Sequence, residues 1–143
     1  MSRPDLDALL NALLPFAQQM LKKHGEFFPF GASMTQDGAI TLAGSYDGKE
    51  HPSPQEVIAW LVNTLKGQAS AGQIKAAGIC FDVRVVPPQQ HEKVDAIQVS
   101  LEHISGEAID VFLPYRKGFF DKITYGELFA SSGTSRIFSG NGS

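Results

Sequence analysis

Three segments in the second half of the chain carry apolar side chains at every second position. Such alternation is typical of a β-strand with one buried face, because successive side chains point to opposite sides of the strand. We therefore predict an antiparallel meander in which these side chains share one dry face. The apolar positions are Ile79, Phe81, Val83 and Val85, then Ile97, Val99 and Leu101, then Ile109, Val111 and Leu113.

The turn between the last two of these strands determines how they pair. If Ile104-Ser105-Gly106 forms the loop, Leu101 lies opposite Ile109, and the remaining apolar positions also meet. A shift of one residue would place Leu101 opposite Asp110, so the pattern favours the first register. The connection between the first two strands, Pro87 to Glu92, is longer and is predicted to be exposed.

The first half of the chain shows the spacing of an amphipathic helix near its start. Leucines at 6, 9, 10, 13 and 14 define one buried stripe. Pro15 lies inside this stretch and is expected to kink or break the helix, because proline lacks an N–H and clashes with the preceding turn. Gly25 is the predicted terminator.

A hairpin and a second helix follow. With a three-residue loop at Gln36-Asp37-Gly38, Met34 faces Ile40 and Ala32 faces Leu42, whereas a two-residue loop would set Met34 against Thr41, so we prefer the longer loop. The string Ser53-Pro54-Gln55-Glu56 combines a capping serine, a first-turn proline and a glutamate three residues after the cap. This string predicts the start of the second helix.

The elements are thus expected in the order α-β-β-α-β-β-β. Because consecutive strands are usually neighbours, we predict an α+β fold: one five-stranded antiparallel sheet with both main helices on the dry face. The element order resembles that of profilin-like and roadblock-like domains. Residues 1–138 are expected to form a single domain and residues 139–143 a disordered tail.

Composition argues against several classes of function. The chain has 143 residues and a formal net charge of −3, which disfavours nucleic acid as a general partner, because phosphate binding requires a basic surface; a local basic patch is compatible with this charge. The single cysteine, Cys80, can form neither an internal disulfide nor a multi-thiolate metal site. No signal peptide and no apolar run that spans a membrane is recognised, so we expect a cytoplasmic protein.

Several polar side chains are predicted to project from the wet face of the meander. Asp82, Arg84, Glu102 and Asp110 alternate with the apolar ladder, and the deduced pairing sets Asp82 beside Gln98. An acid pair can transfer protons if a pocket raises one pKa. The alternative, which we favour, is a solvated sheet face with cross-strand charge pairs.

The four histidines do not show the spacing of a helical zinc site, so no metal is expected. His103 should face Glu107 across a turn as a weak surface ion pair. His51 lies in a polar loop just before the second helix, where free backbone donors can bind an anion; a plain turn is the preferred alternative.

An aromatic and basic cluster follows the last predicted strand: Tyr115, Arg116, Lys117, Phe119 and Phe120. Aromatic and arginine side chains supply most interface hot spots, so the cluster is a candidate contact surface. In the alternative interpretation the two phenylalanines close one end of the core while the cations remain in water. Neither a nucleophile elbow nor a phosphate-binding glycine loop occurs in the chain.

Three strings resemble a family of small uncharacterised bacterial proteins: Gly25 to Gly31, Ala77 to Val85 and Val111 to Lys117. The resemblance covers about Leu14 to Phe138, implies a bacterial cytosolic origin and carries no assigned activity or functional residues. Because small antiparallel sheets expose edge strands and no catalytic motif stands out, we expect a non-enzymatic protein-interaction module, without cofactor, that pairs with itself or another protein through an edge strand or the wet sheet face. The alternative is a small-ligand or enzymatic site near Asp82, Arg84 and Glu102, or in the loop around His51.

Overall fold

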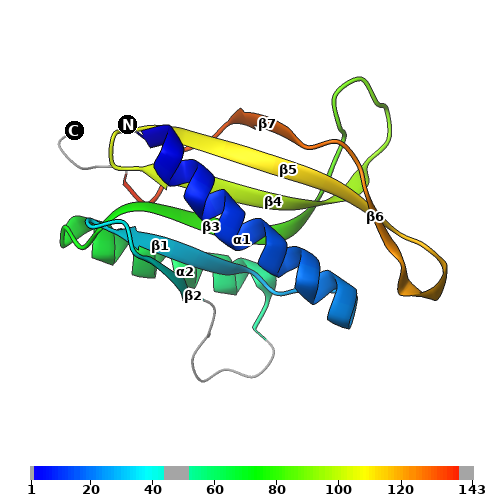
Figure 1. The fold of residues 1–143 in the computed structure, drawn as a ribbon, viewed down its shortest axis with the longest axis horizontal. Coiled ribbons are helices and arrows are strands. Elements are labelled where there is room, and N and C mark those ends of the chain that lie inside the picture. Colours follow the sequence, from blue (N-terminus) through cyan, green and yellow to red (C-terminus); the bar gives the residue numbers. More distant parts are fainter. Residues whose placement is uncertain (1, 44–51, 139–143) are drawn as a thin grey trace.

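The computed structural model describes residues 2–43 and 52–138 and shows two helices and one antiparallel sheet in these ranges (Figure 1). The helices are α1 (Ser2–His24) and α2 (Pro54–Ser70), and a short 3-10 helix, η1, spans Phe119–Asp121. The strands are β1 (Phe30–Thr35), β2 (Ile40–Ala43), β3 (Ile74–Val85), β4 (Val94–His103), β5 (Ala108–Lys117), β6 (Ile123–Tyr125) and β7 (Phe129–Ser132).

The sheet has the order β2-β1-β3-β4-β5-β6, and β7 also pairs with β5. The predicted α+β class and antiparallel sheet are confirmed, and the first seven elements follow the predicted order. The predicted number of five strands is too small, because β6 and β7 form in the segment after Pro114 where the sequence shows no alternating pattern. Both pair with β5, β6 with its second half and β7 with its first half.

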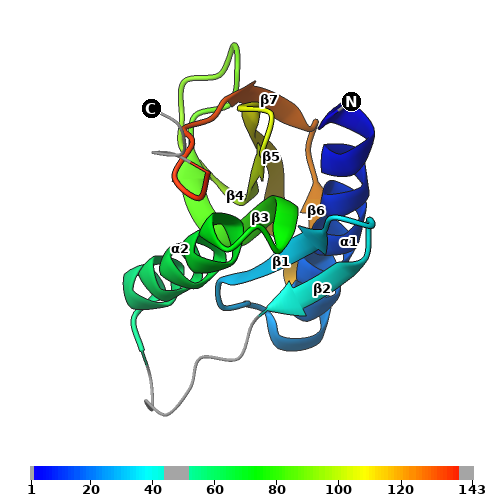
Figure 2. The ribbon, with the colours of Figure 1, turned by 90° about the vertical axis from the view of Figure 1, so that its left-hand side faces the viewer.

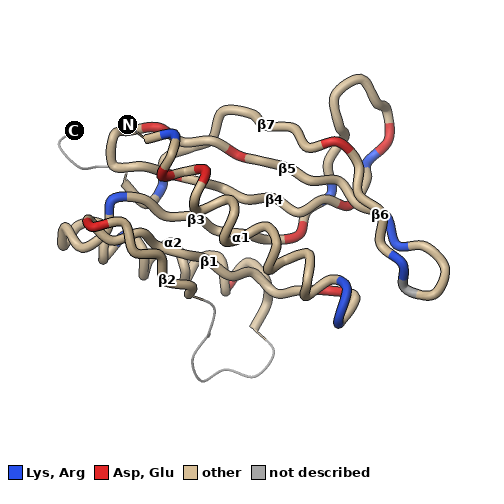
Figure 3. Tube along the Cα trace, in the orientation of Figure 1, with Lys and Arg blue, Asp and Glu red and all other residues tan. Residues whose placement is uncertain are grey.

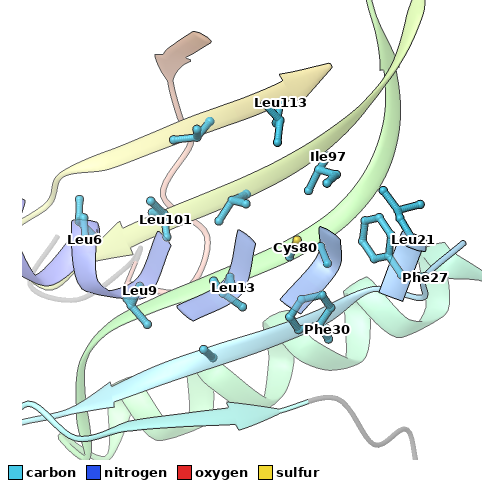
Figure 4. Close-up of a cluster of buried hydrophobic side chains, with 14 of the residues drawn as sticks. Leu6, Leu9, Leu13, Leu21, Phe27, Phe30, Cys80, Ile97, Leu101 and Leu113 are labelled. Carbon is cyan, nitrogen blue, oxygen red and sulfur yellow. The ribbon is translucent and has the colours of Figure 1, made fainter. Parts of the chain in front are cut away.

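The two helices lie on opposite faces of the sheet, so the prediction that both cover one face is wrong (Figure 2). Helix α1 packs on β1, β3, β4 and β5 through an extended cluster that includes Leu9, Leu13 and Leu21 (Figure 4). Helix α2 packs on the other face with Leu61 and Leu65 against Ile79. Each face therefore has its own core.

The register between β3 and β4 explains this arrangement. Cys80 lies opposite Val99 and Asp82 opposite Ile97, one residue away from the predicted pairing of Asp82 with Gln98. Consequently Cys80 shares the α1 face with Val99, whereas Ile79 belongs to the α2 core. The predicted apolar ladder is thus divided between the two faces at β3.

Glycine makes two close approaches feasible, one between α1 and β3 and one between β1 and β3. A Cβ atom at Gly78 would lie 2.7 Å from Leu13 Cδ1 on α1. A Cβ atom at Gly31 would lie 2.9 Å from the carbonyl oxygen of Gly78 and 3.6 Å from Leu61 Cδ2 on α2. A side chain at Gly78 would push α1 away from the sheet, and one at Gly31 would displace β1 from β3.

Most local predictions are confirmed. The first hairpin pairs Met34 with Ile40 and Ala32 with Leu42, and the β4–β5 hairpin pairs Leu101 with Ile109. The side chain of Ser53 accepts a hydrogen bond from the Glu56 N–H, and the Glu56 side chain accepts one from the Ser53 N–H, which completes the predicted capping box.

Helix α1 continues through Pro15, contrary to the expected break. Pro15 lies on the exposed side of the helix, and so does Asn11. A residue other than proline at position 15 would donate its N–H to the Asn11 carbonyl. That carbonyl can be hydrated, which lowers the cost of the interruption. The predicted tail, residues 139–143, lies outside the described residues.

Candidate functional site

The acids predicted to share a wet face do not come together. Asp82 and Arg84 belong to the alternate positions of β3 that face the α1 side, whereas Glu102 and Asp110 lie on the α2 side. The predicted joint site of Asp82, Arg84 and Glu102 is therefore wrong. The prediction failed because the register of β3 turns Asp82 and Arg84 to the opposite face from Glu102.

Asp82 instead forms a pair with Tyr115, which was predicted as part of a different cluster. The Tyr115 hydroxyl donates a hydrogen bond of 2.8 Å to Asp82 Oδ1. Burial raises the pKa of Asp82, and the hydrogen bond with Tyr115 opposes this effect. Burial and the neighbouring carboxylate both raise the pKa of Tyr115, so the phenol remains protonated. The Tyr115 side chain is buried and packs in the α1 core.

Arg84 makes an exposed cross-strand pair. Its Nη1 lies 3.3 Å from Asp95 Oδ1, and the two side chains are 63% and 41% exposed. Such a pair contributes little to stability, because water screens it. The preferred expectation of cross-strand charge pairs therefore holds for Arg84, with Asp95 as the partner.

Glu102 is a structural anchor. Its side chain is buried, and Oε1 accepts hydrogen bonds from the backbone N–H groups of Arg136, Ile137 and Phe138 and from the Ser135 hydroxyl. These bonds hold the C-terminal segment against the α2 core, where Ile137 and Phe138 are buried. Sequence alternation could not reveal this role, because the donors come from a segment without a periodic pattern.

His103 is buried instead of forming the predicted surface pair with Glu107. Its Nε2 lies 2.9 Å from Asp5 Oδ2, and Nδ1 accepts a hydrogen bond from the Ser105 N–H. The hydrogen bond from His103 is the main cause that lowers the pKa of Asp5, and Lys75 Nζ, 3.5 Å away, also contributes. Both ring nitrogens are engaged in hydrogen bonds, so His103 joins α1 to the sheet.

The remaining predictions concern His51 and metal binding. His51 and the polar loop before α2 lie outside the described residues. Within residues 2–43 and 52–138, no group of three or more His, Cys, Asp or Glu side chains is arranged to hold a metal ion.

The most unusual surface is the turn between β5 and β6, residues 118–122, which we call the β5–β6 tip. Phe119 is 90% exposed and Phe120 is 101% exposed, so the interpretation that they close the core is wrong. Phe120 has φ 61° and ψ 34°, a left-handed conformation that is rare for a bulky residue. Backbone hydrogen bonds from Gly118 N to Lys122 O and from Lys122 N to Phe119 O close the turn.

A groove lies between this turn and the C-terminal half of α1; we call it the α1–tip groove. Its volume is about 900 Å³. Helix α1 contributes Pro15, Gln18, Gln19 and Lys22, and the other wall consists of Phe119, Phe120, Lys122, Ile123 and Tyr125. Of the predicted cluster, Tyr115 is buried, and Arg116 and Lys117 are exposed at the base of the tip.

A smaller cavity of about 410 Å³ lies between the β3–β4 loop and the β5–β6 edge. Pro87, Pro114 and Phe129 line it together with the exposed Arg116. Gln89, in the same loop, has φ 64°, and the rings of Phe112 and Phe129 stack with centroids 5.0 Å apart. Neither Asp82 nor Glu102 lines this cavity or the α1–tip groove.

In comparisons with known proteins, no family model, no curated protein and no solved structure matches the chain. The resemblance to small bacterial proteins therefore stays a prediction. Among the described residues, neither helix is both long and apolar enough to cross a membrane.

Proposed function

We propose that this protein is a non-enzymatic protein-interaction module and that the β5–β6 tip is its contact surface. The observation that carries the proposal is the nearly complete exposure of two adjacent phenylalanines on a hydrogen-bonded turn. Burying each ring would be favourable by about 1.5–3 kcal/mol, a gain that a partner can provide and water cannot. Aromatic anchors of this kind dominate protein interfaces.

The backbone of Phe120 supports the same proposal. Its left-handed conformation costs on the order of 1–3 kcal/mol, and such strain is concentrated at functional sites. By contrast, the free sheet edges offer little for strand addition. Strand β2 has four residues, and the opposite edge is divided between β6, with three, and β7, with four.

Site-specific photocross-linking tests the proposal. A benzophenone amino acid is placed at position 119, and the full chain is expressed in its native cells. The matched control carries the same group at Ile104, which is also exposed but lies in the turn at the other end of β5. We expect a discrete adduct from position 119 only, which decreases when the unlabelled wild-type protein competes.

The double variant Phe119→Ser with Phe120→Asn serves as the unlabelled competitor control. Asn tolerates the left-handed conformation, so this variant should fold normally and fail to compete. Equal adducts from positions 119 and 104, or equal competition by the double variant, would refute the proposed contact surface.

A second candidate function is the binding of a small molecule in the 410 Å³ cavity, whose size is within the usual range of ligand sites. Its lining combines apolar surface with polar side chains, among them Arg116 and Glu127, so it suits an amphipathic molecule that carries a charged group. A fragment screen by NMR should then shift the amide signals of Gln89 and Arg116 together. Hits that shift neither residue would rule this candidate out.

A further inference from the structure

We infer that the α1–tip groove takes a segment of the partner protein in which apolar side chains are flanked by carboxylates. This inference rests on the proposed function and specifies the chemistry of its partner. It depends on the composition of the groove walls, on the charges at its rim and on its shape.

The two walls of the groove differ in chemistry. The tip and β6 supply apolar surface from Phe119, Phe120 and Ile123, together with Tyr125, which is 38% exposed. The α1 wall is more polar and includes the amides of Gln18 and Gln19. A segment with one apolar side and one polar side complements these walls, as amphipathic helices do in other protein grooves.

The rim of the groove is basic although the whole chain is weakly acidic. Lys22 on α1 and Lys122 on the tip face the groove from its two sides, and they are the charged residues among the lining side chains that the structure describes. Neither lysine forms an ion pair with an acidic side chain of residues 2–43, 52–120 and 122–138. Figure 3 shows basic residues at both the end of α1 and the β5–β6 turn. Carboxylates on the partner would complement this charge.

The shape of the site favours a polypeptide segment over a lipid surface. A bilayer could take up the two protruding phenylalanine rings, but it would leave the groove behind them without a ligand. A groove of about 900 Å³ is at the upper end of the usual size of ligand sites and is large enough for several side chains. Two aromatic rings alone are far smaller than the roughly 800 Å² that each partner buries in a stable protein complex. The groove supplies additional contact area.

The experiment uses a random peptide display library selected on the full chain, followed by affinity measurements with the most enriched synthetic peptide. We expect enriched peptides that combine aromatic or aliphatic residues with Asp or Glu. Added salt should weaken their binding. The variant Lys22→Glu with Lys122→Glu should bind at least about tenfold more weakly, because attraction becomes repulsion at two positions.

Lys66→Glu is the matched charge control, because Lys66 is exposed on α2, across the sheet from the groove. It should leave the affinity unchanged. The double variant Phe119→Ser with Phe120→Asn should abolish binding. All of these side chains are exposed, so circular dichroism and the melting temperature of each variant should match those of the wild type.

Three results would overturn the inference. The first is enrichment of peptides without acidic residues, or equal binding by the Lys22→Glu/Lys122→Glu variant. The second is co-sedimentation of the protein with vesicles that contain anionic lipid, if this co-sedimentation requires Phe119 and Phe120. The third is dimerisation that the same two phenylalanines mediate. If the adduct from position 119 persists while the charge reversal has no effect, only the acidic chemistry of the partner is refuted.

Discussion

At Gly78, α1 lies so close to the sheet that a methyl group has no room. A Cβ atom there would also meet Leu101 Cδ2 at 2.9 Å. Gly78→Ala should therefore lower the free energy of unfolding by about 1–3 kcal/mol, measured by urea denaturation, because the helix or the leucines must move.

Gly67 provides the matched control for this substitution. It lies within α2, and a Cβ atom there would have no neighbour within 4 Å. Gly67→Ala should leave stability unchanged or raise it by up to about 1 kcal/mol, because alanine favours the helix. Similar losses in both variants would contradict the proposed close packing at Gly78.

The bond between Asp5 and His103 predicts a dependence of stability on pH. The folded state lowers the pKa of Asp5 below its usual 3.8, so the stabilisation is present above that pH and is lost as the pH falls through the folded value. Asp5→Ala should unfold more easily than the wild type at neutral pH, by on the order of 1 kcal/mol. The difference should decrease in strongly acidic buffer.

Asp7→Ala is the control, because Asp7 is exposed on the same helix. Urea denaturation at several pH values should show a smaller and less pH-dependent effect for it. A difference between Asp5→Ala and the wild type that stays constant down to the lowest pH would argue against the assigned role of Asp5.

At the scale of elements, loop length decided which strand registers could be predicted. The hairpins with loops at Asp37-Gly38 and Ser105-Gly106 are short, so one turn geometry specifies the pairing and the apolar pattern selects it. The connection from β3 to β4 is longer and leaves the register open. In addition, Ile79 and Cys80 are both buried, so alternation cannot indicate which face of β3 belongs to which core.

The candidate site was predictable only in part, for a related reason. The aromatic and basic residue types from Tyr115 to Phe120 identified the segment. The exposure of the two phenylalanines depends on a left-handed residue at Phe120, which is not a residue type that favours that conformation. Strands β6 and β7 are too short and too exposed for a period-two pattern.

The C-terminal segment yields a prediction about Glu102. Glu102→Ala removes the acceptor of four hydrogen bonds and should cost about 2 kcal/mol or more, because buried N–H groups lose their partner. Glu102→Gln keeps an acceptor oxygen and should cost less. Hydrogen exchange of the Ile137 and Phe138 amides measures the effect; unchanged protection in Glu102→Ala would show that other contacts hold the segment.

At the scale of the whole molecule, two cores share one sheet, so we expect them to unfold together. Leu13→Ala in the α1 core should destabilise the protein by about 2–5 kcal/mol. Trp60, the single tryptophan, packs against the α2 core on the other face. Its fluorescence should therefore report the same shift in the urea midpoint as circular dichroism. If Leu13→Ala leaves the urea midpoint of the Trp60 fluorescence transition unchanged, the two layers unfold independently.

The burial of Cys80 has a practical consequence for studies of this chain. Its side chain has no exposed surface, it is the single cysteine, and burial raises the pKa of its thiol well above the usual value. Alkylating reagents react with the thiolate, so the intact fold should be inert to them, and each labelled molecule records an opening of the α1 core around Cys80. Cys80 thus reports the rate of local opening, and mass spectrometry can measure this rate without an engineered cysteine.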